Sequence, residues 1–443
     1  MKRTASSIFR FWVPLAGQWV MMASEGPFLA ALIARMSDPE YNLAAYGVAF
    51  AFAILMESPV IMLMSAATAL VEDETTYRKL RNFMYGLNAL ATGLLLIVLL
   101  PRVYGPLMGT LLGLPEPVAD LTYGALWLLL PWPAAIGYRR FLQGILIRAG
   151  RTRLVALGTV LRLVSMGCTG AVLYTHFALP GAWAGAAALS VGVGVEAIAA
   201  RFMAADAVRD LHHQKGVLHM RAPHPGRKPL GYRGIARFYY PLALTSLIGL
   251  AAQPMLTFFM GRGLAPIESL AVFPVVHALS FLFRSLGLSF QEAALALLGD
   301  DCEHFPEIAS FALWLGLATS AGLGLVAFTP LASVWFGTVS GLTPELAAFA
   351  LVPVRILVPI PALSVLLALE RAVLIQARTT HPITIATTIE VACIAVLFVA
   401  LGWGLDLVGV TAAFLAFLGG RSASVLYLLR SAVGTIRSAG SAS

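Results

Sequence analysis

Charge is what this 443-residue chain has least of. Asp, Glu, Lys and Arg together make up 12% of its residues, whereas soluble domains contain about 25%. Hydrophobic residues make up 59%, and many apolar runs reach about 20 residues, the length that crosses a hydrocarbon core of about 30 Å. The composition excludes an ordinary soluble protein and predicts a polytopic membrane protein of the all-α class.

Cysteine is scarce as well. Cys168, Cys302 and Cys393 share no metal-binding or redox spacing, so we expect neither a disulfide framework nor a metal site. The chain also lacks the G-x-x-x-x-G-K-[ST] pattern of P-loop nucleotide hydrolysis, H-E-x-x-H and G-x-S-x-G. We therefore expect no enzymatic activity and no cofactor, apart from H⁺ or Na⁺ as a coupling ion.

Hydropathy and helix-breaking residues predict twelve membrane spans, near 8–34, 42–71, 80–100, 119–147, 153–175, 182–206, 234–260, 266–299, 306–329, 345–376, 381–401 and 407–430. Lys and Arg gather in the connections that are cytoplasmic if the N-terminus is inside, so both termini are predicted cytoplasmic. The Ala-, Leu- and Arg-rich composition indicates a bacterial-type inner membrane. Anionic lipid explains the net charge of +8, and we expect a monomer without a nucleic-acid partner.

The two halves of the chain repeat each other. "IFRFWVPLAG" (8–17) matches "IARFYYPLAL" (235–244) at an offset of 227, and "PWP" (131–133) falls on "PIP" (359–361) at an offset of 228. The repeat predicts an N-lobe (1–206) and a C-lobe (234–443) of six spans each, joined by a basic cytoplasmic linker (207–233). Parallel repeats of this kind are typical of transporters that bind substrate between the halves near the membrane midplane.

Few ionisable residues lie inside the predicted spans, where each costs about 2.5–3.5 kcal/mol on insertion scales. The repeat relates three pairs of opposite sign: Glu57 with Arg284, Arg162 with Glu390 and, one helical turn apart, Glu196 with Arg421. We predict that some of these pairs join the lobes across a cleft, with Glu57 and Arg284 lining it. In the alternative, each charge is satisfied within its own half, for example Glu57 by Arg162.

Glu25 differs from these residues because no charged residue occupies the equivalent position in the second half, which is Ala252. A carboxyl without a counter-charge in a low-dielectric cavity could exchange a proton near neutral pH, so Glu25 is the predicted ion-coupling residue. The alternative is a neutral glutamic acid that is hydrogen-bonded to the neighbouring backbone. We expect six prolines to bend the spans around the site: Pro27, Pro254, Pro131, Pro133, Pro359 and Pro361.

Other polar residues lie on spans expected to line the cleft. Arg139 and Arg140 could meet an anionic substrate or extend to the cytoplasmic surface. Gln253 and His277 could form hydrogen bonds with substrate, although a lone histidine on an apolar helix is more often satisfied within the core. The excess of arginine favours an anion as the substrate.

Several short stretches resemble a known superfamily: "FWVPLA" (11–16), "LAAYGVAFAF" (43–52), "YYPLAL" (239–244), "GRGL" (261–264) and "LVPVRILVPIPA" (351–362). With two six-span halves and a polar first span, the chain resembles the multidrug and toxic compound extrusion (MATE) and polysaccharide flippase superfamily, also called MOP. Within it, the chain is most similar to the progressive ankylosis (ANK) proteins. The resemblance implies a V-shaped, two-lobed exporter of small anions, with Glu25 as the acidic residue of the first span and Arg355 as a cavity residue.

The predicted function is secondary active export of a small organic solute, with an anion favoured, by alternating access between the two lobes. A lipid-linked saccharide flippase and an antiporter of cationic drugs with H⁺ or Na⁺ are the alternatives among transporters. A non-transporting membrane scaffold is the alternative from a different class, and it predicts that all buried charges are paired.

Overall fold

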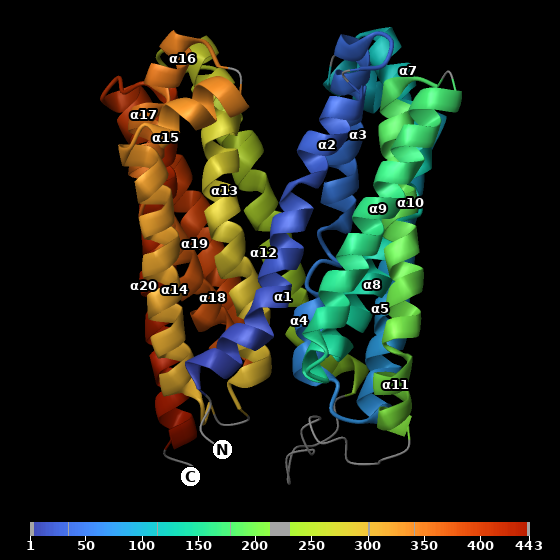
Figure 1. Ribbon diagram of the computed structural model, residues 1–443, viewed down its shortest axis with the longest axis vertical. Helices are drawn as coiled ribbons and strands as arrows, with labels where there is room; N and C mark the ends of the chain where they lie inside the picture. The colour runs from blue at the N-terminus through green and yellow to red at the C-terminus, as the bar shows by residue number, and fades with distance from the viewer. Residues whose placement is uncertain are drawn as a thin grey trace. The chain divides into compact units, whose positions relative to one another are not determined.

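The computed structural model describes residues 4–33, 35–112, 114–177, 179–212, 231–299, 302–340 and 342–440. Within these ranges the regular elements are helices, apart from a single bridge between Leu264 and Val408 (Figure 1). Nine helical stretches of this part of the chain are long and apolar enough to span a membrane. The chain is thus an all-α, multi-pass membrane protein, as the sequence predicted.

Residues Met21–Tyr239 form one compact unit, called the N-unit from here on. Its helices are α2 (Glu25–Ile33), α3 (Pro39–Glu57), α4 (Leu63–Leu70), α5 (Glu74–Leu99), α6 (Pro101–Gly105), the π-helical turn η1 (Pro106–Leu111), α7 (Glu116–Leu129), α8 (Trp132–Arg148), α9 (Thr152–His176), α10 (Gly181–Met203) and α11 (Ala205–His212).

Residues Met1–Val20 and Tyr240–Ser443 form the second compact unit, called the C-unit. It contains most of α1 (Ala5–Ala23) and of α12 (Tyr232–Met260). The rest are α13 (Pro266–Leu297), α14 (Phe305–Phe328), α15 (Leu331–Ser333), η2 (Val334–Val339), α16 (Pro344–Phe349), α17 (Leu351–Ile356), α18 (Ile360–Gln376), α19 (His381–Phe398), η3 (Val399–Gly404) and α20 (Gly409–Gly440). The predicted lobes divide the chain differently at these edges, since they assign all of the first span to the first half.

Three predicted spans of the first half are built from two shorter helices each. The first is interrupted between Ala23 and Glu25, the second over 58–62 and the fourth between α7 and α8. Proline explains the second break, because the backbone before Pro59 disfavours a continuing helix. The carbonyl oxygen of Pro59 accepts a hydrogen bond of 2.6 Å from the Tyr239 hydroxyl, so a backbone group at this break is satisfied within the N-unit.

The six prolines expected to bend the spans lie at different places in the helices, and only some of them lie at a break. Pro131 and Pro359 directly precede α8 and α18, and Pro133 and Pro361 lie in the first turns of these helices. Position 254, by contrast, lies within the uninterrupted helix α12, because a membrane helix tolerates an isolated proline. Position 27 lies in the first turn of α2, just after the break. The side chains of Pro27 and Pro254 lie outside the described residues.

Close packing of α19 against α20 depends on a glycine. A Cβ atom added to Gly420 would lie 2.6 Å from the carbonyl oxygen of Glu390 and 2.7 Å from Cγ1 of Ile394. Small residues let membrane helices approach each other closely, and this contact is one example. The same approach brings α19 and α20 together where their charged side chains meet.

We expect Gly420→Ala to destabilise the protein by about 1–3 kcal/mol, because the methyl group would force the two backbones apart. Gly434→Ala on the same helix is the matched control, since nothing lies within 4 Å of an added Cβ there. The measurement is the thermal unfolding of the detergent-solubilised protein. Equal unfolding midpoints for the two variants would contradict the close contact between the helices.

Candidate functional site: a buried charge cluster in each unit

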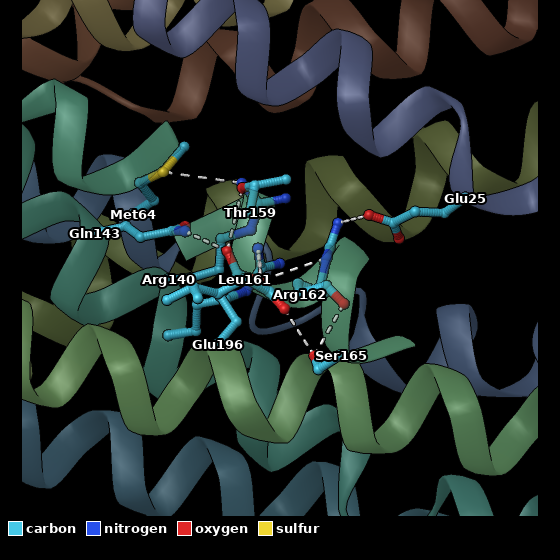
Figure 2. Close-up of polar contacts among 10 residues, drawn as sticks. Glu25, Met64, Arg140, Gln143, Thr159, Leu161, Arg162, Ser165 and Glu196 are labelled. Carbon is cyan, nitrogen blue, oxygen red and sulfur yellow. Dashed lines mark hydrogen bonds and ion pairs between the residues drawn. The ribbon is translucent and has the colours of Figure 1, made fainter. Parts of the chain in front are cut away.

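Ionisable and polar side chains of four N-unit helices meet in one buried cluster (Figure 2). This N-cluster consists of Glu25 from α2, Arg139 and Gln143 from α8, Thr159 and Arg162 from α9, and Glu196 from α10. The residues come from segments up to 171 positions apart, from residue 25 to residue 196, so only the packed helices bring them together.

Glu196 lies at the centre of the N-cluster and is fully buried. Its Oε2 accepts a hydrogen bond of 2.9 Å from Nη1 of Arg139, which is also fully buried. Its Oε1 accepts bonds from Nε2 of Gln143 at 3.1 Å and from Oγ1 of Thr159 at 3.2 Å. A buried carboxylate with this many donors is held in one position, because a charge-assisted hydrogen bond is stronger than a neutral one.

Arg162 connects Glu196 to Glu25. Its Nε lies 3.4 Å from Oε2 of Glu196, while its Nη2 forms an ion pair with Oε1 of Glu25 (Figure 2). The Arg162 side chain is 2% exposed, and that of Glu25 is 13% exposed. Glu25 also begins α2, where the helix dipole favours a negative charge. With Arg139, the two carboxylates and two guanidinium groups give a cluster that is neutral as a whole.

This arrangement corrects the expectation that Glu25 lacks a counter-charge, because Arg162 supplies one. Arg162 and Glu196 were predicted to pair with residues of the other half, but here they contact each other, which is the alternative of pairing within one half. Pairing across the two halves stays a prediction. The internal repeat relates equivalent positions, and equivalence alone does not place two side chains in contact.

The two neighbouring arginines of α8 do not extend to the cytoplasmic surface. Arg139 is fully buried against Glu196, and Arg140 is 4% exposed, with its Nη1 3.9 Å from Sδ of Met64 (Figure 2). The carboxylate of Glu196 compensates the first of these charges inside the unit, so that side chain need not reach water.

Glu57 lies close to the N-cluster but is bonded to none of its members. It is the last residue of α3, directly before the break over 58–62, and it is 7% exposed. Across the part of the chain that the structure describes, its carboxyl group forms no hydrogen bond or ion pair. The charges that act on it most strongly are those of Arg140, Arg139 and Arg162. Glu57 is therefore a second buried carboxyl beside the same arginines.

The C-unit contains a cluster with an excess of positive charge, whereas the N-cluster is neutral. Nε and Nη2 of Arg421 lie 2.9 and 2.7 Å from Oε1 of Glu390. Nη2 of Arg371 donates to Oγ1 of Thr387 at 3.0 Å. The third guanidinium, that of Arg284, lies 5.0 Å from the ring centre of Phe417, and Arg421 lies 5.5 Å from the same ring. We call Arg284, Arg371, Thr387, Glu390 and Arg421 the C-cluster.

Arg284 has no carboxylate partner among the described residues of the C-unit, and its predicted pairing with Glu57 of the other half stays a prediction. Its Nη1 lies 3.4 Å from Nε2 of His277, and no carboxylate within the described ranges lies within 4.0 Å of it. Its Nε has no hydrogen-bond partner there either. Of the predicted cleft residues, the structure thus brings His277 and Arg284 together.

Arg355 contacts no member of the C-cluster in the described part of the chain. It is an exposed side chain whose Nε donates to the carbonyl oxygen of Ala327 at 3.4 Å and whose guanidinium lies 5.4 Å from the ring centre of Phe328. The side chain of Gln253 lies outside the described residues. No group of three or more His, Cys, Asp or Glu side chains in the described ranges could hold a metal ion.

Sequence reasoning missed four members of the clusters, and the internal repeat contained the signal. At the offset of 228, Thr159 falls on Thr387 and Gln143 falls on Arg371, just as Arg162 falls on Glu390. The same three positions of the repeat thus contribute to both clusters. The charge is reversed between Arg162 and Glu390, and Arg371 carries a charge where Gln143 has none. Gln143, Thr159 and Thr387 are uncharged and therefore do not stand out among the few ionisable residues of the spans.

Comparison with known proteins identifies the fold. No family model and no curated protein matches the sequence. A mutant of the Vibrio cholerae MATE transporter VcmN matches with a TM-score of 0.74 and 16% identity over 98% of this chain and 97% of that one. The eukaryotic MATE transporter AtDTX14 matches with a TM-score of 0.69 and 16% identity over 98% of both chains.

A third similar structure is that of a MOP superfamily transporter from Pyrococcus furiosus, which is described as having a binding pocket of reversed polarity. Its TM-score is 0.74, with 13% identity over 98% of this chain and 97% of that one. Because these identities are low, the likeness is one of fold. The chain has the twelve-span fold of MATE and MOP transporters, as the sequence predicted.

Proposed function

We propose that this protein is a secondary active transporter that exports a small organic solute and is coupled to an ion through Glu25. The observation that carries the proposal is the buried series Glu25–Arg162–Glu196 next to a break in the first span. Buried ion pairs contribute little net stability, and ionisable residues within spans typically mark ion and substrate pathways. A scaffold would have all its buried charges paired, whereas the carboxyl group of Glu57 and the guanidinium of Arg284 have no ion-pair partner within the described residues.

Glu25 is the member of the series that an ion can reach. It has the most exposed side chain of the three, and it starts a helix whose predecessor ends two residues earlier, at Ala23. When an ion neutralises Glu25, Arg162 loses one of its two carboxylates but keeps Glu196. The ion pair between α2 and α9 is then released while the rest of the N-cluster stays in place, which would link ion binding to alternating access of the two lobes.

We propose an anion as the class of solute, because the C-cluster holds three guanidinium groups and one paired carboxylate. This excess disfavours a cationic drug and fits the resemblance to ANK proteins, which forms part of the same proposal. A lipid-linked saccharide, which carries phosphate, is the second candidate for the same reason. From the distribution of Lys and Arg we further propose a monomer in a bacterial-type inner membrane, with both termini cytoplasmic.

The test is uptake and efflux of a panel of solutes in proteoliposomes under an imposed pH or Na⁺ gradient. We expect Glu25→Gln to reduce the gradient-driven flux of the transported anion to the level of empty liposomes, because the amide cannot exchange a proton and lacks the charge that binds a cation. Glu116→Gln, at an exposed glutamate in the first turn of α7, should transport like the wild type. Normal gradient-driven transport by Glu25→Gln would refute the coupling role but not the transporter itself.

A further inference from the structure

We propose that Arg162 determines the ion specificity of the coupling site: its guanidinium occupies the place beside Glu25 that a metal cation would need, so the site accepts H⁺ and rejects Na⁺. The inference rests on the proposed function and names its coupling ion. It follows from how Arg162 is held, from the ligands around Glu25 and from the charges that face it.

The guanidinium of Arg162 cannot easily leave Glu25. Its Nε remains 3.4 Å from Glu196, which three other donors hold in place. Helix α10 also packs tightly against the base of this side chain. A Cβ at Gly192 would lie 3.1 Å from the carbonyl oxygen of Arg162 and 3.3 Å from its Cγ. The guanidinium of Arg162 is therefore a permanent positive charge beside Glu25, and the base of its side chain and its Nε are held in place.

The surroundings of Glu25 offer few of the oxygen ligands that a hard metal cation needs. The group bonded to its carboxylate is a guanidinium, which has donors only. A broken membrane helix often supplies carbonyl oxygens to Na⁺. Here the carbonyl of Met21 accepts bonds from the backbone N–H and hydroxyl of Ser24, and the carbonyl of Ser24 accepts one from Phe28. Position 27 is a proline and donates no N–H to the carbonyl of Ala23, so one carbonyl at the break remains for a cation, fewer than the several oxygen ligands that a metal cation needs.

A proton makes no such demand, because it needs a single carboxylate oxygen. It adds to Glu25 to give a neutral carboxylic acid, and the positive charge left over in the N-cluster stays on Arg162, beside Glu196. Loss of the proton on the other side of the membrane restores the ion pair. No further ligand and no movement of the fixed end of Arg162 are required.

The groups facing Glu25 come from four neighbouring helices: Arg162 of α9, Glu196 of α10, Tyr46 and Glu57 of α3, and Arg139 of α8. Of the carboxyl groups among them, that of Glu196 accepts three hydrogen bonds and pairs with Arg162, whereas that of Glu57 has no hydrogen-bond or ion-pair partner in the described ranges. Glu57 could take up a proton of its own, so a pH-dependent signal must also be measured in Glu57→Gln.

The test compares thermal unfolding of the purified protein in NaCl and in choline chloride at equal ionic strength. We expect identical midpoints in the two salts for the wild type and for Arg162→Lys, which keep a cation beside Glu25. Arg162→Gln should unfold at a higher temperature in NaCl than in choline chloride, because the amide oxygen and the freed carboxylate can then bind Na⁺. Arg153→Gln, at an exposed arginine of the same helix, is the matched control and should behave like the wild type.

A Na⁺-dependent rise in the midpoint of the wild type would overturn the proposal even if Arg162→Gln failed to fold. A folded Arg162→Gln variant without a Na⁺ response would overturn it as well. In proteoliposomes, a pH gradient should drive the wild type and the exposed control Glu116→Gln, whereas a Na⁺ gradient should drive neither. Absence of any transport would count against the proposed function alone, because the salt comparison needs no flux.

Discussion

Arg162→Leu should lower the free energy of unfolding by about 3–5 kcal/mol, the cost of removing one partner of a buried ion pair. The substitution leaves Arg139 with Glu196, so these two charges still compensate each other. Glu25 loses the one ion-pair partner that it has among the described residues and keeps a carboxylate in a largely buried position. The expected loss of stability is thus the cost of that single unpaired charge.

A double variant tests whether the loss of stability comes from the unpaired charge of Glu25. Arg162→Leu/Glu25→Leu removes both charges and should recover stability to within about 1 kcal/mol of the wild type, since apolar replacement of a whole buried pair is often neutral. Arg153→Leu, at the exposed arginine of α9, should change stability by no more than about 0.5 kcal/mol. The measurement is unfolding of the detergent-solubilised protein. If the double variant were less stable than Arg162→Leu, the two residues would not be acting as a pair.

The membrane spans and most of their breaks could be predicted from the sequence because they depend on local properties. Apolar runs set the positions of the spans, and the "PWP" and "PIP" motifs mark the breaks before α8 and α18. Pro254 shows the limit of such reasoning, since α12 continues through it. Whether a proline interrupts a helix depends on how neighbouring groups satisfy the freed backbone.

Predicting which charges pair required information that the sequence does not provide. Glu25, Arg162 and Glu196 could all be recognised as intramembrane charges, but the contacts of Arg162 depend on the rotation of α9 against α2 and α10. Arg139 illustrates the same point, because it and Arg140 are adjacent in sequence while one bonds to Glu196 and the other approaches Met64. The faces of a helix are predictable, whereas the partner that each face meets depends on the packing.

Replacement of Glu390 should destabilise the protein more than replacement of its ion-pair partner Arg421. Glu390→Leu should lower the free energy of unfolding by about 3–5 kcal/mol, because it leaves Arg421 buried without its carboxylate. The charge of Glu390 also acts on Arg284 and Arg371, so three guanidinium groups lose a common compensating charge. Arg421→Leu should cost clearly less, since Glu390 keeps two arginines nearby.

Two control substitutions and the addition of phosphate test whether the destabilisation comes from excess positive charge or from altered packing. Glu345→Leu and Arg430→Leu replace exposed residues of α16 and α20 and should change stability by no more than about 0.5 kcal/mol. Phosphate should raise the unfolding midpoint of Glu390→Leu more than that of Arg421→Leu, because the first variant has the greater positive excess. Equal destabilisation by the two substitutions, with no effect of phosphate on either, would mean that Glu390 and Arg421 form an isolated pair. The excess of arginine in the C-unit would then give no support to an anionic substrate.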